Sequence, residues 1–219
     1  MSKPILLVIA GCNGSGKSSF SNLLATAEFE PFDYDYHYLK NYKALFDSDV
    51  REIMAHNMAF SALEDNIQRA INNNSNFCYE TNFNSTPLYW PQIFQQNNFE
   101  LRLIYLCLNS IKEAQRRVDI RVENGGHFVS KEEIEKRYFD GFGNLNSHFS
   151  YFNKVDLFET SNYGEPPSHI LSIENNSITQ TADIPTYLQK LIPEILKLSW
   201  KNNCPFSRTL QTPTYLFVL

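Results

Sequence analysis

The sequence predicts an α/β fold in which helices flank a parallel sheet. Apolar runs of strand length alternate with helix-length segments, the first run ends in a glycine-rich loop, and the 219 residues contain no long linker or internal repeat. We therefore expect one domain over residues 1–199, and we assign no structure to the C-terminal tail, residues 200–219.

The first half of the chain predicts three strands and three helices in alternation. Short apolar runs predict buried strands, and apolar side chains three and four residues apart predict helices. Pro91 lies inside the third helix, so we expect a break or kink there. The expected strands are 4–10, 28–33 and 77–80, and the expected helices are 17–27, 48–73 and about 86–97.

The second half continues the alternation and ends in a hairpin and a helix. Ser110 and Ser130 are typical helix N-caps, and Glu133 completes a capping box with Ser130. The hairpin is expected to turn at Asn175-Asn176. The expected strands are 101–108, 155–159, 169–173 and 178–179, and the expected helices are 110–123, 130–146 and 185–198.

The glycine-rich loop at 11–18 predicts a phosphate-binding site. It fits G-x-x-x-x-G-K-[ST] and lies between a strand and a helix, which is the context that this P-loop motif requires. Its glycines let backbone N–H groups point at phosphates, Lys17 would reach the β- and γ-phosphates of ATP, and Ser18 would bind Mg²⁺. A glycine turn with a surface lysine is the alternative. The expected ATP-binding residues are Gly11, Asn13, Gly14, Ser15, Gly16, Lys17, Ser18 and Ser19.

Acidic residues follow the second and third expected strands, at the edge of the sheet where ligands bind. Asp35 is our candidate for the general base that accepts the proton of an attacking hydroxyl, with Asp33 as the alternative. Either acid could instead cap a turn or helix. Glu80 and Thr81 are candidates for binding substrate hydroxyls or a Mg²⁺-bound water, unless Glu80 is a solvated charge at a strand end.

Arginines and a double glycine follow further along the chain. Arg117 and Arg121 are four residues apart and share a helix face, so both are candidates for stabilising a transferring phosphoryl group. Pairing with neighbouring acids is enough to explain Arg116. The double glycine before His127 predicts a hinge for a mobile lid. His127 is a candidate for contacting substrate, with a capping or solvent role as the alternative.

These motifs together resemble the zeta toxin group of P-loop kinases, specifically its short bacterial zeta-toxin-like ATPases. The resemblance covers roughly the first three quarters of the chain. It implies an adenylate-kinase-like core, a helical lid near 117–140, and ATP and Mg²⁺ as ligands. The segments that carry it are 9–18, 33–36, 77–81 and, above all, 117–138.

The resemblance also implies an activity. Characterised zeta toxins phosphorylate the 3′-hydroxyl of the sugar in UDP-N-acetylglucosamine, so the sugar of a UDP-N-acetylhexosamine is a candidate acceptor here. The family's general base matches Asp35 best, and its strand-end Glu-Thr pair matches Glu80 and Thr81. Its lid arginines match Arg117 or Arg121.

Three residues depart from the usual family pattern and leave the acceptor open. Cys12 stands where proline is common, Tyr36 where an acid is common, and Asn82 where a threonine is common. Substrate-facing side chains decide specificity. The leading hypothesis is an ATP-dependent small-molecule kinase. The alternative is an ATP-binding or ATPase module that acts with a protein partner, as in a toxin–antitoxin pair.

The composition limits the binding partners and the cellular compartment that we expect. A net charge of −5 without a basic stripe argues against nucleic acid as the main partner. No apolar run approaches 18 residues, and the first run ends in the phosphate loop rather than at a cleavage site. We therefore expect no membrane contact and a cytoplasmic location. The four cysteines lack zinc spacing, and we expect Cys78 and Cys107 in the core.

Overall fold

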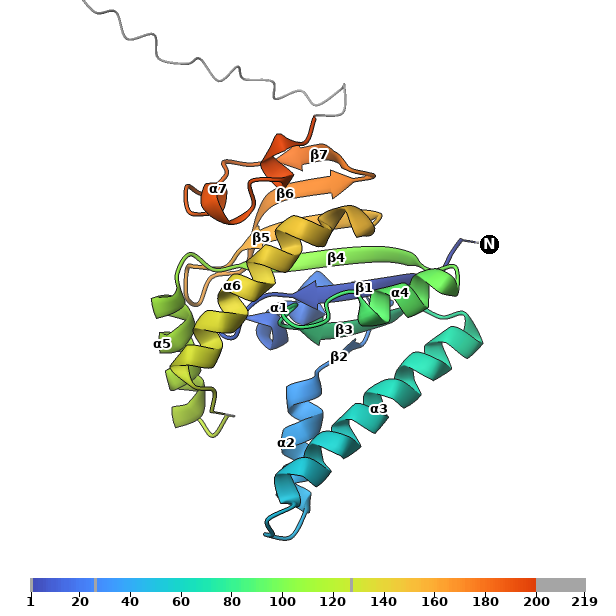
Figure 1. Ribbon diagram of the computed structural model, residues 1–219, viewed down its shortest axis with the longest axis vertical. Helices are drawn as coiled ribbons and strands as arrows, with labels where there is room; N and C mark the ends of the chain where they lie inside the picture. The colour runs from blue at the N-terminus through green and yellow to red at the C-terminus, as the bar shows by residue number, and fades with distance from the viewer. Residues whose placement is uncertain (1, 26, 127, 200–219) are drawn as a thin grey trace, which may run out of the picture.

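The computed structural model describes residues 2–25, 27–126 and 128–199, and it has the predicted α/β architecture (Figure 1). One sheet runs in the order β2-β3-β1-β4-β5-β6-β7. The first five strands in this order are parallel, and β6 and β7 extend the sheet as an antiparallel hairpin. The strands are β1 (Ile5–Ala10), β2 (Pro31–Phe32), β3 (Phe77–Thr81), β4 (Glu100–Cys107), β5 (Lys154–Glu159), β6 (Ser168–Glu174) and β7 (Ser177–Thr181).

Helices pack against both faces of the sheet. Leu63, Phe94, Val118 and Phe142, from four different helices, join the larger core on one face, whereas the segment that follows α1 covers part of the other face. None of the described helices is long and apolar enough to cross a bilayer. The helices are α1 (Lys17–Leu24), α2 (Tyr34–Ala44), α3 (Arg51–Asn73), α4 (Tyr89–Gln96), α5 (Ile111–Glu123), α6 (Lys131–His148) and α7 (Leu188–Leu191).

The local signals for helix starts and for the hairpin are confirmed. The Ser110 side chain accepts a hydrogen bond from the backbone N–H of Glu113, which starts α5, and Ser130 starts α6 in the same way. Asn175 and Asn176 have φ values of 49° and 60°, a left-handed conformation that asparagine tolerates. They form the turn between β6 and β7, as expected.

Two prolines act differently from the prediction. Pro91 does not break α4, because the helix begins at Tyr89 and the proline lies in its first turn, where a backbone N–H has no partner within the helix. The predicted closing helix 185–198 is wrong as one element. Pro193 separates α7 from a short 3-10 turn at Ile195–Lys197, because its ring and missing N–H prevent the helix from continuing.

Helix α2 was not predicted. The sequence predicts a strand over 28–33 and no helix directly after it, but the strand is limited to Pro31–Phe32 and Asp33 is the N-cap of a helix that runs to Ala44. Tyrosine-rich segments have only moderate helix propensity, so packing decides this element. Tyr38 of α2 is buried against Ala55 and Ala59 of α3, and Figure 1 shows the two helices projecting together from the sheet.

The topology places the phosphate loop at the centre of the sheet. β1 lies between β3 and β4, and the chain leaves β1 toward the β2–β3 side before it crosses to β4. This reversal of direction is a topological switch point, where open α/β sheets bind ligands beyond the carboxyl ends of their strands. The loop at 11–16 follows β1 at this point.

Candidate active site

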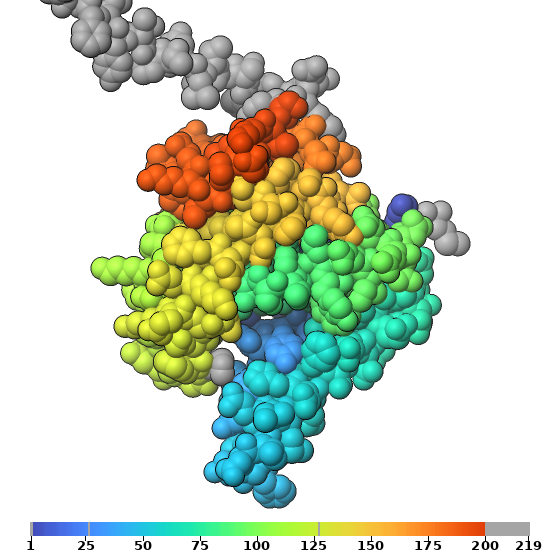
Figure 2. All heavy atoms as spheres, viewed as in Figure 1, coloured from blue at the N-terminus to red at the C-terminus, as the bar shows by residue number. Residues whose placement is uncertain are grey.

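A cavity of about 930 Å³ lies at the carboxyl ends of β1 and β3. Figure 2 shows it as a hollow between the blue α2, the green residues that follow β3, and the yellow-green α5 and α6. Gly11 and Ser15 are buried behind the cavity, and His127 lies outside the described residues. The predicted site residues that line the cavity are Asn13, Gly14, Gly16, Lys17, Ser18, Ser19, Asp33, Asp35, Glu80, Thr81, Arg117 and Arg121.

The phosphate loop has the backbone that an anion site needs. Gly14 and Gly16 have φ values of 79° and 89°, and a Cβ at Gly14 would stand 2.8 Å from the Ala114 carbonyl oxygen of α5. Side chains are therefore excluded at these positions. Helix α1 begins at Lys17, immediately after the loop, so its N-terminal N–H groups and dipole face the same space. The loop fits the triphosphate of ATP.

Lys17 is held by three oxygens in this structure. Its Nζ donates to the carbonyl oxygens of Gly11 (2.8 Å) and Cys12 (3.2 Å), and to Oδ1 of Asn82 (2.9 Å). Burial lowers the pKa of Lys17, while nearby Glu80 and Asp35 act in the opposite direction. The sequence analysis treats Asn82 only as a departure from the family pattern and does not expect it to bind Lys17. The signal for this contact was its position directly after Thr81, at the end of the strand that pairs with β1.

Ser18 and Glu80 form the second polar pair of the site. The Ser18 hydroxyl donates to Oε2 of Glu80 at 2.8 Å. Burial and then the nearby Asp33 raise the pKa of Glu80 above its ordinary value. No group of three or more His, Cys, Asp or Glu side chains with metal-site geometry occurs among the described residues. Mg²⁺ commonly takes one or two protein oxygens and completes its shell with phosphates and water, so this pair fits it.

The two candidate bases have different surroundings. Asp33 caps α2, because its Oδ1 accepts a hydrogen bond from the Tyr36 backbone N–H at 3.1 Å. Asp35 lies in the first turn of α2, and its Oδ2 is 4.0 Å from Nη1 of Arg121 on α5. Half of the Asp35 side chain is exposed to the cavity and solvent. Asp33 therefore has a structural task, whereas Asp35 is available to a ligand.

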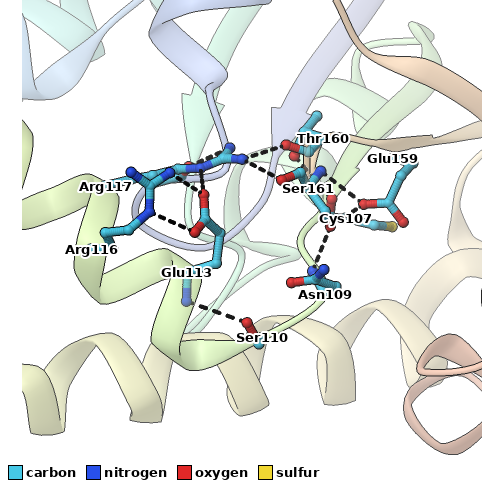
Figure 3. A network of polar contacts seen from close by, with 10 residues as sticks. Cys107, Asn109, Ser110, Glu113, Arg116, Arg117, Glu159, Thr160 and Ser161 are labelled. Atoms are coloured by element: carbon cyan, nitrogen blue, oxygen red, sulfur yellow. Dashed lines mark hydrogen bonds and ion pairs between the residues drawn. The ribbon is translucent and has the colours of Figure 1, made fainter. Parts of the chain in front are cut away.

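Arg117 is held tightly by the protein (Figure 3). Its side chain is only 8% exposed, and it donates to Glu113 (2.6 Å) and to the carbonyl oxygens of Thr160 (2.8 Å) and Ser161 (2.9 Å). A further bond at 3.3 Å reaches the carbonyl oxygen of Gly14 in the phosphate loop. This guanidinium joins α5, the segment after β5 and the loop. Arg121, one turn further along α5, has a side chain that is 39% exposed.

The remaining predicted residues support the loop or the cavity wall. Asn13 accepts a bond at 3.3 Å from Nη1 of Arg137 on α6, so this helix also contacts the loop. The hydroxyl of Thr81 accepts from the Phe83 backbone N–H at 3.0 Å. Cys12 is buried, and burial raises the pKa of its thiol to about 11, so it is a core side chain. Cys78 and Cys107 are buried as expected.

Comparison with known families decides which family this site belongs to. The model of the zeta toxin family matches residues 1–150, more than half of the chain, and this stretch holds the phosphate loop, both aspartates, Glu80 and both arginines. The chain belongs to the zeta toxin family. A separate search among curated proteins finds no match.

Solved structures show the same fold at low identity. A chain of the PezAT toxin–antitoxin system of Streptococcus pneumoniae is 15% identical, with a TM-score of 0.57 over 90% of this chain and 89% of that one. A chain of the AvrRxo1-ORF1:AvrRxo1-ORF2 complex is 13% identical, with a TM-score of 0.63 over 88% of this chain and 64% of that one. A chain of the Pnkp1/Rnl/Hen1 RNA repair complex is 22% identical, with a TM-score of 0.52 over 67% of this chain, which spans only 47% of that one.

The zeta toxin match ends before the last part of the cavity wall. Asn162, Tyr163 and Gly164 line the cavity from the segment after β5, and they lie beyond residue 150. In this family member the site is therefore completed by a part of the chain for which the family model gives no expectation.

Proposed function

We propose that this zeta toxin family member transfers the γ-phosphoryl group of ATP to a hydroxyl of a small-molecule acceptor. The observation that carries the proposal is the placement of Lys17 and Ser18 opposite Asp35 and Arg121 in one cavity. A phosphate-binding loop on one side and a carboxylate with a cation on the other are what transfer to a hydroxyl requires.

In this proposal the loop holds the triphosphate. Lys17 exchanges its bonds with the loop carbonyls for the β- and γ-phosphates, while Asn82 keeps its ammonium group in place. Ser18 and Glu80 would hold Mg²⁺, which neutralises charge on the phosphates when it is bound. The N-terminus of α1 adds backbone donors.

Asp35 and Arg121 act on the transfer itself. Asp35 orients the acceptor hydroxyl and takes its proton. Arg121 is close enough to Asp35 to contact the transferring phosphoryl group and stabilise its charge. We assign Arg117 a positioning role, because the protein itself accepts its hydrogen bonds. It fixes Gly14 of the loop against α5.

The acceptor is proposed to lie on the β2–β3 side of the cavity. Phe60, Leu63 and Trp90 line the cavity together with Asn84 and Ser85, which offers apolar surface and polar groups for a molecule larger than water. Thr81 and His127 remain candidates for contacting it. The sugar of a UDP-N-acetylhexosamine is the acceptor to test first, since the family resemblance implies it. Because ATP is a cytoplasmic substrate, we propose that the reaction takes place there.

The direct test is incubation of the protein with ATP, Mg²⁺ and UDP-N-acetylglucosamine or UDP-N-acetylgalactosamine, followed by mass spectrometry. The proposal expects one added phosphate on the nucleotide sugar and an equal amount of ADP. A phosphorylated product with another acceptor would support the kinase and reject this acceptor. ADP with inorganic phosphate and no phosphorylated product from any acceptor would reject the kinase.

A second candidate function is an ATP-binding module that acts with a protein partner. One structural neighbour comes from the PezAT toxin–antitoxin system and another from the AvrRxo1-ORF1:AvrRxo1-ORF2 complex, which favours a protein antitoxin as a partner here. ATP binding without any phosphorylated acceptor, together with a stable complex with a small protein encoded beside this one, would support that function.

A further inference from the structure

Tyr163 lies in the cavity wall beyond the family match and has no role in the proposal so far. It follows β5 at the carboxyl edge of the sheet, between Asn162 and Gly164. Its side chain is 59% exposed, so a ligand in the cavity can reach it. The Arg116 guanidinium carbon lies 4.8 Å from the centre of its ring, and that of Arg117 lies 5.4 Å away.

The arginines under this ring are joined through one carboxylate. Arg116 and Arg117 both donate to Glu113, and Figure 3 shows their guanidinium groups converging on that carboxylate. The hydrogen bonds from Arg116, with those from Arg117, lower the pKa of Glu113 to about 2, so it is ionised at neutral pH. Tyr163 therefore rests on two guanidinium groups that are both hydrogen-bonded to Glu113. Aromatic rings on such supports bind further planar groups by stacking.

The direction of phosphoryl transfer places the donor nucleoside on this side. In an in-line transfer, the attacking oxygen and the leaving oxygen lie on opposite sides of the phosphorus. Asp35, the proposed base, lies on the β2–β3 side of the phosphate loop, so the leaving diphosphate and its nucleoside must extend toward the β4–β5 side. Tyr163 is the aromatic side chain that the segment after β5 brings to that side of the cavity.

We infer that Tyr163, supported by Arg116 and Arg117, is the surface on which the base of the donor nucleotide stacks. The inference rests on the proposed function for the identity of the donor. It adds a base-binding subsite to the phosphate loop and divides the cavity into a donor side at β5 and an acceptor side at β2–β3. Stacking is tolerant of the base, so the subsite adds affinity for a nucleoside as such.

The test compares binding of ATP with binding of inorganic tripolyphosphate, which lacks the nucleoside. Both dissociation constants are measured by calorimetry with Mg²⁺ for the wild-type protein, Tyr163→Ala and Tyr163→Phe. Phe139→Ala is the matched control, because Phe139 is an exposed aromatic residue on α6 that does not line the cavity. Thermal unfolding of each variant checks that it is folded.

The inference expects Tyr163→Ala to raise the Kd of ATP about tenfold and to leave the Kd of tripolyphosphate within twofold. Tyr163→Phe and Phe139→Ala should bind both ligands like the wild type. If Tyr163→Ala bound ATP with unchanged affinity, or lost affinity for ATP and tripolyphosphate equally, the base-binding subsite would be rejected. The kinase proposal would not be affected. A wild-type protein that binds neither ligand would overturn both.

Discussion

Arg121 on α5 and Asp35 on α2 face each other across the cavity, with 4.0 Å between Nη1 and Oδ2. Both side chains are partly exposed, at 39% and 52%, so the pair contributes little to folding. The two residues are 86 positions apart in the sequence. In the proposed reaction, this pair brings a cation and a carboxylate to the place where the acceptor hydroxyl meets the γ-phosphate.

The first prediction concerns Arg121. Arg121→Gln should lower the rate of phosphoryl transfer by about 10²–10³-fold, because a preorganised donor to the transferring group is lost. The free energy of unfolding should change by less than about 0.5 kcal/mol. Steady-state kinetics and thermal unfolding measure the two effects. Arg69→Ala, at an exposed position on α3, is the control. A variant that loses stability but keeps its rate would assign Arg121 a structural role.

The second prediction separates the two aspartates. Asp35→Asn should keep the affinity for ATP and lose transfer by about 10²–10⁴-fold, because the base is removed. Asp33→Asn should keep the rate, since asparagine also caps helices, and Asp33→Ala should cost about 1 kcal/mol of stability. Calorimetry with ATP and a transfer assay are the measurements. If Asp33→Asn abolished transfer and Asp35→Asn did not, the base would be Asp33.

The third prediction concerns the stability that Glu113 contributes through Arg116 and Arg117, and its loss at low pH. The hydrogen bonds from Arg116 and Arg117 lower the pKa of Glu113 from 4.5 to about 2. A carboxyl group whose pKa is lowered by folding stabilises the folded state at pH values above its unfolded-state pKa. This stability is lost as the pH falls from about 4.5 to about 2. Glu113→Gln should therefore be less stable than the wild type by about 1 kcal/mol at pH 7, because Arg116 is half exposed and solvent screens its ion pair.

The pH dependence of that difference is the check. Urea unfolding of the wild type and of Glu113→Gln at several pH values should give a gap that narrows below pH 4.5, since the wild-type carboxylate is being protonated. Glu64→Gln, at an exposed position on α3, should show no such gap. A gap that stays constant down to pH 2 would mean that the charge of Glu113 does not stabilise the fold.

The fourth prediction concerns Mg²⁺. Glu80→Gln keeps the size of the side chain and removes its charge, so the Mg²⁺ concentration for half-maximal transfer should rise about tenfold while the affinity for ATP without metal stays the same. A Mg²⁺ titration of activity measures this shift. An unchanged Mg²⁺ requirement would mean that Glu80 does not bind the metal, and would favour a contact with the acceptor instead.

The sequence predicted the sheet and the phosphate loop because their signals are local. Apolar runs, a fixed glycine spacing and serine caps each lie within a few residues. Helix α2 was missed because it is stabilised by the packing of Tyr38 against α3 rather than by the helix propensity of its residues. The different tasks of Arg117 and Arg121 were also hidden, because the carbonyl groups that fix Arg117 lie more than 40 residues further along the chain.

Lys17 of the phosphate loop gives the most direct test of phosphoryl transfer by this protein. The protein is incubated with ATP labelled at the γ-phosphate and a fractionated extract of small metabolites, and the products of the wild type, Lys17→Ala and Asp35→Asn are compared. We expect a labelled phosphomonoester from the wild type, and none from either variant, although Asp35→Asn still binds ATP. Labelled inorganic phosphate as the only product, or a wild-type rate in Lys17→Ala, would contradict this expectation.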